Sequence, residues 1–135
     1  MIAVLDASVA VEILLQRKHA DLLGARVIDA EWVLVPSVYT SELCNVFWKY
    51  HMHSRQTMTR EICEHLIAKG MALPDTVADD RELYREAFAM ACACTSTVYD
   101  MMYLVLARRN SAHLLTMDRK LRKIASTHDV QVMQD

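Results

Sequence analysis

The sequence predicts an α/β fold in which a parallel β-sheet is covered by helices on both faces. Short apolar runs typical of buried strands alternate with longer segments of helical periodicity, and this alternation favours a parallel sheet. Hydrophobic residues make up 53% of the 135 residues, and the chain has only two glycines and two prolines. That composition excludes disorder, and the length predicts a single domain spanning residues 1–135.

The N-terminal half is predicted to contain two strands and four helices. We expect strands at residues 2–5 and 32–35 and helices at about 8–16, 19–30, 37–53 and 57–70. Ser8 and Ser37 are the predicted N-caps of the first and third helices. Pro36 is expected to stop the second strand, and Gly70 to end the fourth helix.

The C-terminal half is predicted to contain a loop, three helices and two strands. Pro74 and the acidic segment that follows it to Asp80 are expected to form the loop. Beyond it we expect helices at about 81–94, 98–109 and 118–126 and strands at 113–116 and 130–132. A polar break at 95–97 separates the first two of these helices.

Charge and cysteine usage exclude several classes of protein. The net charge of −2 argues against binding through a broad basic surface, although metal ions can supply positive charge at a phosphate site. Cys44, Cys63, Cys92 and Cys94 form neither a C-x-x-C pair nor a disulfide framework. We expect no secretory leader before Asp6, and no apolar run reaches the ~18 residues that span a bilayer. We therefore expect a cytoplasmic protein with reduced thiols and no membrane association.

Four carboxylates occupy positions typical of a functional site. Asp6 directly follows the first strand, and Asp118 follows the strand at 113–116. Asp100 lies in the first turn of its predicted helix, where the helix dipole favours an anion, and Glu42 lies within an apolar helical pattern. Ligands of open parallel sheets bind beyond the carboxyl ends of the strands. These acids are therefore expected to converge on one cleft.

Clustered carboxylates must be protonated, separated or neutralised by a cation. Two of them ~4 Å apart repel by roughly 4 kcal/mol at an effective dielectric constant of ~20. Four would cancel much of the ~5–15 kcal/mol that stabilises a domain. Oxygen ligands without a well-placed histidine or cysteine select Mg²⁺ or Mn²⁺ over zinc. The chemistry that this site favours is metal-assisted hydrolysis of a phosphodiester.

Four segments, taken in chain order, resemble signatures of the PIN-domain family. They are residues 4–9 (VLDASV), 41–46 (SELCNV), 98–107 (VYDMMYLVLA) and 115–121 (LTMDRKL). Each motif alone is weak, but the four in this order are fairly specific. In order, spacing and total length the chain is similar to the VapC-type toxins of bacterial toxin–antitoxin pairs, and the resemblance covers essentially all of it.

The resemblance implies a three-layer α/β/α sandwich with a central parallel sheet and a Mg²⁺- or Mn²⁺-dependent endoribonuclease. It assigns four residues to the catalytic site: Asp6, Glu42, Asp100 and Asp118. The three aspartates would bind one or two metal ions, and Glu42 would be a further ligand or the base for the attacking water. In-line attack on RNA would leave a 5′-phosphate and a 3′-hydroxyl.

The resemblance also implies supporting residues and protein partners. Ser8 and Thr116 would support the acids, and Asn45, which shares a helix face with Glu42, would either support the acids from behind or form part of the site wall. The partners would be a second copy of the chain and a cognate antitoxin that blocks the cleft. One departure is Met101-Met102, where the family usually has a small residue after the aspartate, which leaves the local helix packing open.

Each acid also has a purely structural explanation. Asp118 could be an N-cap, Asp6 a strand-end turn residue, Asp100 a partner of the helix dipole, and Glu42 an ion-pair partner of Lys49. Four such coincidences in family order are less economical than one shared site.

Two other functions and one further contact stay open. The chain could be a catalytically inactive PIN-like protein-interaction module. A different α/β phosphohydrolase would be supported by an Asp-x-Asp motif after the first strand, but Ala7 and Ser8 follow Asp6. Arg119 and Lys120 are typical of a solvated helix face, with contact to the RNA backbone as the alternative.

Overall fold

A four-stranded parallel sheet forms the centre of the molecule, which a computed structural model describes over residues 1–133. Residues 134–135, the end of the predicted domain, lie outside the described residues. The strand order is β3-β2-β1-β4, and each neighbouring pair is parallel. The strands are β1 (Ile2–Leu5), β2 (Trp32–Pro36), β3 (Thr76–Ala78) and β4 (His113–Leu115). This arrangement confirms the predicted α/β class.

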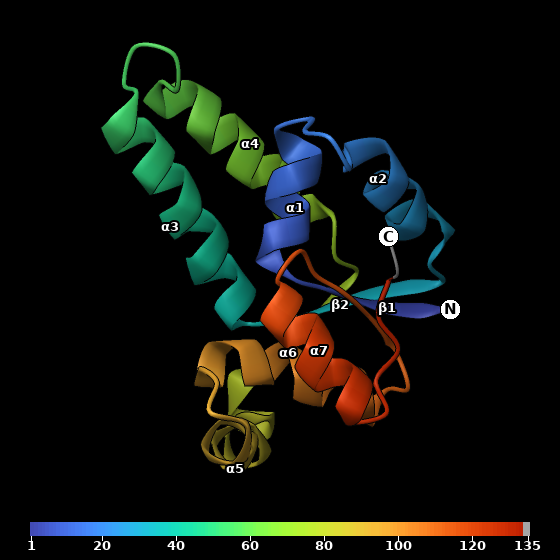
Figure 1. The fold of residues 1–135 in the computed structure, drawn as a ribbon. Helices are drawn as coiled ribbons and strands as arrows, with labels where there is room; N and C mark the ends of the chain where they lie inside the picture. Colours follow the sequence, from blue (N-terminus) through green and yellow to red (C-terminus); the bar gives the residue numbers. More distant parts are fainter. Residues whose placement is uncertain (134–135) are drawn as a thin grey trace.

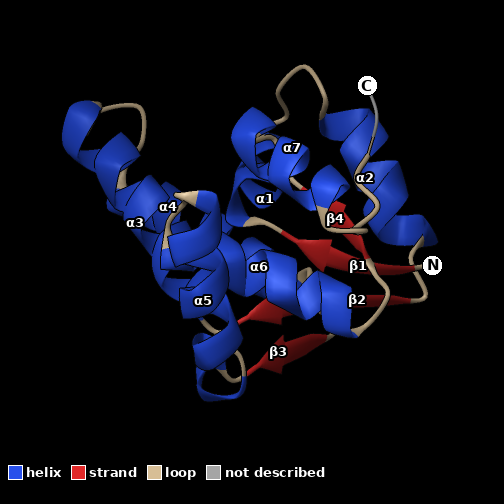
Figure 2. Cartoon of the chain, turned by 60° about the horizontal axis from the view of Figure 1, so that its bottom comes forward, coloured by secondary structure: helices blue, strands red, loops and turns tan. Residues whose placement is uncertain are grey.

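Helices cover both faces of the sheet, which explains why β1 and β2 are apolar along nearly their whole length (Figures 1 and 2). They are α1 (Ala7–Leu14), α2 (Ala20–Asp29), α3 (Val38–His53), α4 (Arg60–Ala72), α5 (Tyr84–Cys94), α6 (Val98–Arg109) and α7 (Arg119–Thr127). On one side α1 contacts α2, α3 and α4. On the other side α6 contacts β1, β2 and β4 and packs against α5. The result is the predicted three-layer sandwich.

Helices α3 and α4 form an antiparallel pair that projects away from the sheet (Figure 1). Buried Tyr39 on α3 donates its hydroxyl to the Gly70 carbonyl of α4 at 2.6 Å. A Cβ on Gly70 would overlap the Leu43 side chain, so the two helices approach closely there. Gly70 therefore serves packing and does not end α4, which continues to Ala72. The predicted stop at Gly70 was wrong.

The loop predicted after Pro74 contains the edge strand β3 and a short 3₁₀ helix, η1 (Asp80–Glu82). Three residues are too few for strand periodicity to be recognised in a sequence. Tertiary contacts define this strand, because Trp32 Nε1 donates to Thr76 Oγ1 at 2.8 Å and the Val33 amide donates to Asp75 Oδ2 at 2.8 Å. The loop prediction was wrong at this point.

Three further predictions need correction. Residues 130–132 form one isolated parallel bridge, from Val132 to Leu114, and no strand within the described chain. Asp6, not Ser8, is the N-cap residue of α1. Ser37 does occupy the N-cap position of α3, but its hydroxyl accepts the Asp80 amide at 3.0 Å and makes no capping bond.

Helix α6 is the buried helix of the fold, with Met101 through Ala107 all enclosed. Met101 and Met102 are accommodated in this core, so the departure from the family pattern is resolved by packing. Within residues 1–133 no single helix is long and apolar enough to cross a bilayer, whereas the bent pair of α5 and α6 together meets that criterion of length and composition.

Candidate functional site

The fold brings the four predicted acids to the same end of the sheet. Asp6 directly follows β1, and Asp118 lies three residues beyond the end of β4 at the N-cap of α7. Asp100 lies in the first turn of α6, and Glu42 lies in the second turn of α3. Their charges act on one another, since the Asp6 charge raises the pKa of both Glu42 and Asp100. They therefore lie within electrostatic reach of one another.

Two hydroxyl groups hold Asp6. Thr116 Oγ1 donates to Asp6 Oδ2 at 2.6 Å, and Ser8 Oγ donates to the same oxygen at 2.7 Å. The two hydroxyl oxygens accept the backbone N–H groups of Asp118, at 3.0 Å, and Met117, at 3.1 Å. Since those N–H groups can only donate, both hydroxyl protons are directed at the carboxylate. Predicted supporting residues Ser8 and Thr116 thus contact Asp6 directly and join β1 to the segment after β4.

The buried position of Asp6 opposes its ionisation. Only 6% of its surface is exposed, and this burial raises its pKa above the ordinary value. The hydrogen bonds from Thr116 and Ser8 lower the pKa, whereas the charge of Asp118 raises it. A nearby cation would remove much of this penalty, because it favours the charged form.

Glu42 forms a hydrogen bond with Tyr103, a residue that the sequence did not single out as part of the site. Tyr103 on α6 donates its hydroxyl to Glu42 Oε1 at 2.6 Å, so the structure does not pair Glu42 with Lys49. Burial raises the pKa of Tyr103, which keeps the phenol protonated as a donor. Burial also raises the pKa of Glu42, the Tyr103 bond lowers it, and the charges of Asp6 and Asp100 raise it again. The available signal was the spacing of Tyr103 from Asp100, which is i,i+3 on one helix.

Asp100 and Asp118 are placed by helix N-termini. Thr97 caps α6 by accepting the Asp100 amide at 3.1 Å. Burial and the charges of Asp6 and Asp118 raise the pKa of Asp100, while Thr97 and the charge of Lys120 lower it. Asp118 itself caps α7, since its Oδ1 accepts the Leu121 amide at 3.1 Å. The capping role proposed as the structural explanation of Asp118 is therefore present beside its place among the acids.

The remaining predicted residue, Asn45, lies on α3 one turn after Glu42 and is exposed. Nothing in the described contacts links it to the acids, so its supporting role stays a prediction.

The acids do not form a closed ligand cage. Within residues 1–133 no three histidine, cysteine, aspartate or glutamate side chains lie close enough together to form a ready-made metal site. Carboxylates that face one another without a cation are destabilised at short distance. The donor chemistry fits a hard cation all the same, since all four groups offer carboxylate oxygens and three of them have raised pKa values.

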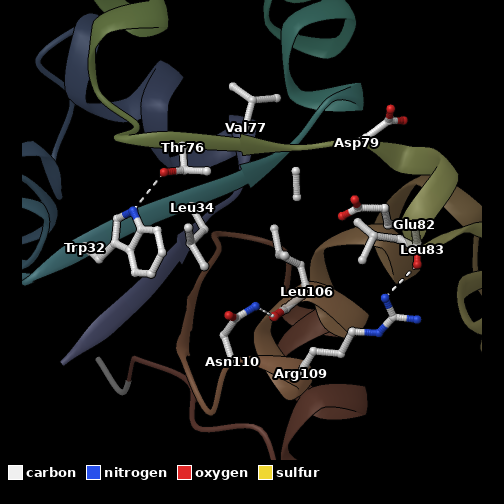
Figure 3. A pocket seen from close by; sticks show the side chains of 11 residues that line it. Trp32, Leu34, Thr76, Val77, Asp79, Glu82, Leu83, Leu106, Arg109 and Asn110 are labelled. Atoms are coloured by element: carbon white, nitrogen blue, oxygen red, sulfur yellow. Dashed lines mark hydrogen bonds between the residues drawn. The ribbon is translucent and has the colours of Figure 1, made fainter.

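A separate hollow of about 480 Å³ runs along the β3 edge of the sheet (Figure 3). Its apolar floor is made by side chains of β2 and α6, with Leu34 and Leu106 among them. Arg109 Nη1 donates to the Glu82 carbonyl at 2.6 Å along one side. None of the four acids lines this hollow, so the acidic site and the apolar groove are different places on the molecule.

Comparison with known sequences gives a consistent picture. The PIN domain family matches residues 3–126. Among curated proteins, Ribonuclease VapC3 of Pyrobaculum aerophilum is 30% identical over 123 residues, which cover 87% of this chain and 90% of the relative.

Three solved structures have a similar fold. PAE2754 from Pyrobaculum aerophilum superposes with a TM-score of 0.73 at 19% identity and covers 92% of this chain and 84% of its own. VapBC2 from Rickettsia felis, crystallised with a DNA fragment from its promoter, gives 0.68 at 14% identity over the full length of both chains. FitAcB from Neisseria gonorrhoeae gives 0.56 at 19% identity over 99% of this chain and 97% of its own.

Proposed function

The chain belongs to the PIN-domain family, and from this premise we propose that it is a metal-dependent endoribonuclease and the toxin of a type II toxin–antitoxin pair. The observation that carries the proposal is the convergence of Asp6, Glu42, Asp100 and Asp118 at the carboxyl ends of the strands, where the charges of neighbouring acids raise the pKa values of Asp6, Glu42 and Asp100. The relationship to a ribonuclease over most of both chains supports RNA as the substrate.

Three aspartates are the proposed ligands for Mg²⁺ or Mn²⁺: Asp6, Asp100 and Asp118. A bound divalent ion polarises a phosphate and lowers the pKa of water, and both effects favour phosphodiester hydrolysis. The Ser8 and Thr116 hydroxyls fix the orientation of the Asp6 carboxylate and favour its ionised form. The Thr97 cap sets the position of Asp100. We assign these three hydroxyl residues to holding the ligand carboxylates in place.

Glu42 is proposed to accept the proton of the attacking water. Its pKa is raised by burial, which moves a carboxylate towards the range where a base works best near neutral pH. Tyr103 orients it through one oxygen, Oε1. The alternative is that Glu42 is a fourth metal ligand. A Glu42 variant with an unchanged metal affinity but slower cleavage would support the role of Glu42 as the base.

The proposed protein partners are an antitoxin and a second copy of the chain. The antitoxin follows from the likeness to toxin–antitoxin proteins such as VapBC2. A homodimer is supported by large exposed apolar side chains on α3 and α5, notably Trp48 at 56% and Phe88 at 62% exposure. Four free cysteines support a reducing, cytoplasmic location.

The central test is RNA cleavage with Mg²⁺ or Mn²⁺ by the purified protein and its Asp6→Asn and Asp100→Asn variants. Loss of a charged ligand is expected to slow cleavage by at least about 100-fold, which corresponds to about 2.7 kcal/mol of activation free energy. The matched control is Asp21→Asn, the same change at an exposed acid in the first turn of α2. Undiminished cleavage in both site variants would overturn the assignment.

Calorimetric titration with Mn²⁺ complements this test. Wild type and Asp21→Asn are expected to bind Mn²⁺, and the two site variants to bind it weakly. A wild type that neither binds Mn²⁺ nor cleaves RNA would favour a protein-interaction module instead.

A further inference from the structure

The first turn of α7 carries a cation beside the acids. Lys120 lies two residues after Asp118, and its Nζ donates to the Thr95 carbonyl at 2.7 Å. Thr95 is the C-cap of α5 in a left-handed conformation, with φ of 51°, and it lies two residues before the Thr97 cap of α6. Lys120 therefore ties α7, whose N-cap is Asp118, to the turn that leads into Asp100.

The ammonium group of Lys120 can donate further hydrogen bonds besides the one to Thr95. It carries three N–H donors, and the bond to Thr95 uses one of them. The side chain is exposed, so the remaining donors are accessible from solvent. The carbonyl that it contacts lies two residues before Thr97, whose hydroxyl accepts the Asp100 amide at 3.1 Å, so the ammonium lies beside the acidic site. Lys120 therefore offers solvent-accessible N–H donors beside the acids.

An RNA substrate favours such a cation at the site. The protein has a net charge of −2 and gathers four carboxylates at the site, so it repels a polyanion at long range. A point charge at the rim of the site offsets this repulsion locally and sets the register of the backbone without reading sequence.

We propose that Lys120 binds an RNA phosphate next to the scissile bond, while its bond to the Thr95 carbonyl fixes where that phosphate lies. The inference rests on the proposed ribonuclease function and deepens it, because it names a substrate contact at the same site. It also selects the RNA-backbone alternative for Lys120 over a merely solvated side chain.

The test measures binding separately from cleavage. In the Asp100→Asn background, without divalent metal, a labelled oligouridylate is titrated by fluorescence anisotropy over a series of KCl concentrations. Each phosphate contact on a single strand contributes about 0.7 to the slope of log affinity against log salt. Lys120→Met is therefore expected to reduce the magnitude of that slope by about 0.7, and Lys120→Arg to keep it.

Lys123→Met is the matched control, because Lys123 is an exposed lysine on the same helix and its loss changes the net charge equally. It is expected to leave the slope unchanged. In the active protein, Lys120→Met is expected to raise KM about tenfold with a smaller effect on kcat. An unchanged melting temperature shows that the fold persists.

The outcomes separate this inference from the proposed function. A salt slope that is the same in Lys120→Met and Lys123→Met, or no measurable RNA binding, overturns the phosphate contact. A lowered melting temperature of Lys120→Met with an unchanged salt slope also overturns the phosphate contact, because Lys120 would then serve only the hydrogen bond to the Thr95 carbonyl. If the salt slope depends on Lys120 but the wild-type protein does not cleave RNA with Mn²⁺, the phosphate contact stands and the proposed ribonuclease function is overturned.

Discussion

Asp6 experiences opposing influences on its pKa. It is nearly enclosed, which raises its pKa, yet two hydroxyl protons point at one of its oxygens and lower it. The balance of burial over hydrogen bonding keeps the pKa above its ordinary value of 3.8. This residue therefore couples the stability of the fold to pH and to any bound cation.

The metal-free protein is expected to lose stability as pH rises. For an acid with a raised folded-state pKa, the folded state binds more protons than the unfolded state. Stability is thus fully present below 3.8 and declines as pH rises through the higher pKa of folded Asp6. Melting temperatures measured from pH 4 to pH 8 should therefore fall more steeply in wild type than in Asp6→Asn.

Divalent metal supplies the control for this prediction. Added Mn²⁺ should raise the melting temperature of wild type more at pH 8 than at pH 4, because ionised carboxylates bind it. Asp6→Asn should show little of this difference. A wild type and a variant with parallel pH profiles would contradict the link between Asp6 and stability.

At the scale of elements, helix N-termini decide where two of the acids lie. Thr97 caps α6, which carries Asp100 in its first turn, and Thr59 caps α4, which carries none of the four acids. Both caps use a threonine hydroxyl that accepts an amide three residues on, at 3.1 Å and 3.2 Å. The two caps form a matched pair with different expected consequences.

Thr97→Ala is expected to lower both stability and activity, whereas Thr59→Ala lowers stability alone. Loss of either cap costs about 1 kcal/mol of unfolding free energy. Only Thr97→Ala loosens the turn that positions Asp100, so cleavage should fall several-fold more in Thr97→Ala than in Thr59→Ala. Chemical denaturation and RNA cleavage assays measure the two effects, and equal activity losses in both variants would show that the Thr97 cap has no special role.

At the scale of the whole molecule, the parallel sheet is what gathers residues from distant parts of the chain. Asp6 and Thr116 are 110 residues apart and are joined by a hydrogen bond, because β1 and β4 are neighbours whose carboxyl ends lie together. Helices α3 and α5 lie on the same side of the molecule in both overall views (Figures 1 and 2), and each carries a large exposed apolar side chain, Trp48 on α3 and Phe88 on α5.

The proposed homodimer can be tested on that side. Phe88→Lys places a charge on exposed α5 and is expected to convert the dimer into a monomer of half the mass, measured by light scattering after size exclusion. Ile28→Lys is the control, because Ile28 is 83% exposed on α2, in the other helical layer. A dimer that survives Phe88→Lys would exclude this face, and a monomeric wild type would exclude the homodimer.

Most of the fold could be predicted because its signals are local. Buried strands β1 and β2 are continuous apolar runs, and each long helix carries its own periodicity. The errors occur where tertiary contacts replace local signals. Strand β3 depends on contacts with Trp32 and Val33. Gly70 ends no helix, because it serves the close approach of α3 and α4.

By itself the sequence determined the α/β class and the family and pointed to four candidate acids, because periodicity and motif order are properties of the chain. Only the tertiary structure decided which groups contact those acids. It directed the Ser8 and Thr116 protons at Asp6, paired Tyr103 with Glu42 and placed Lys120 beside the turn before Asp100. Such contacts and the pKa directions that follow depend on burial and on neighbours distant in sequence, and both exist only once the sheet has formed.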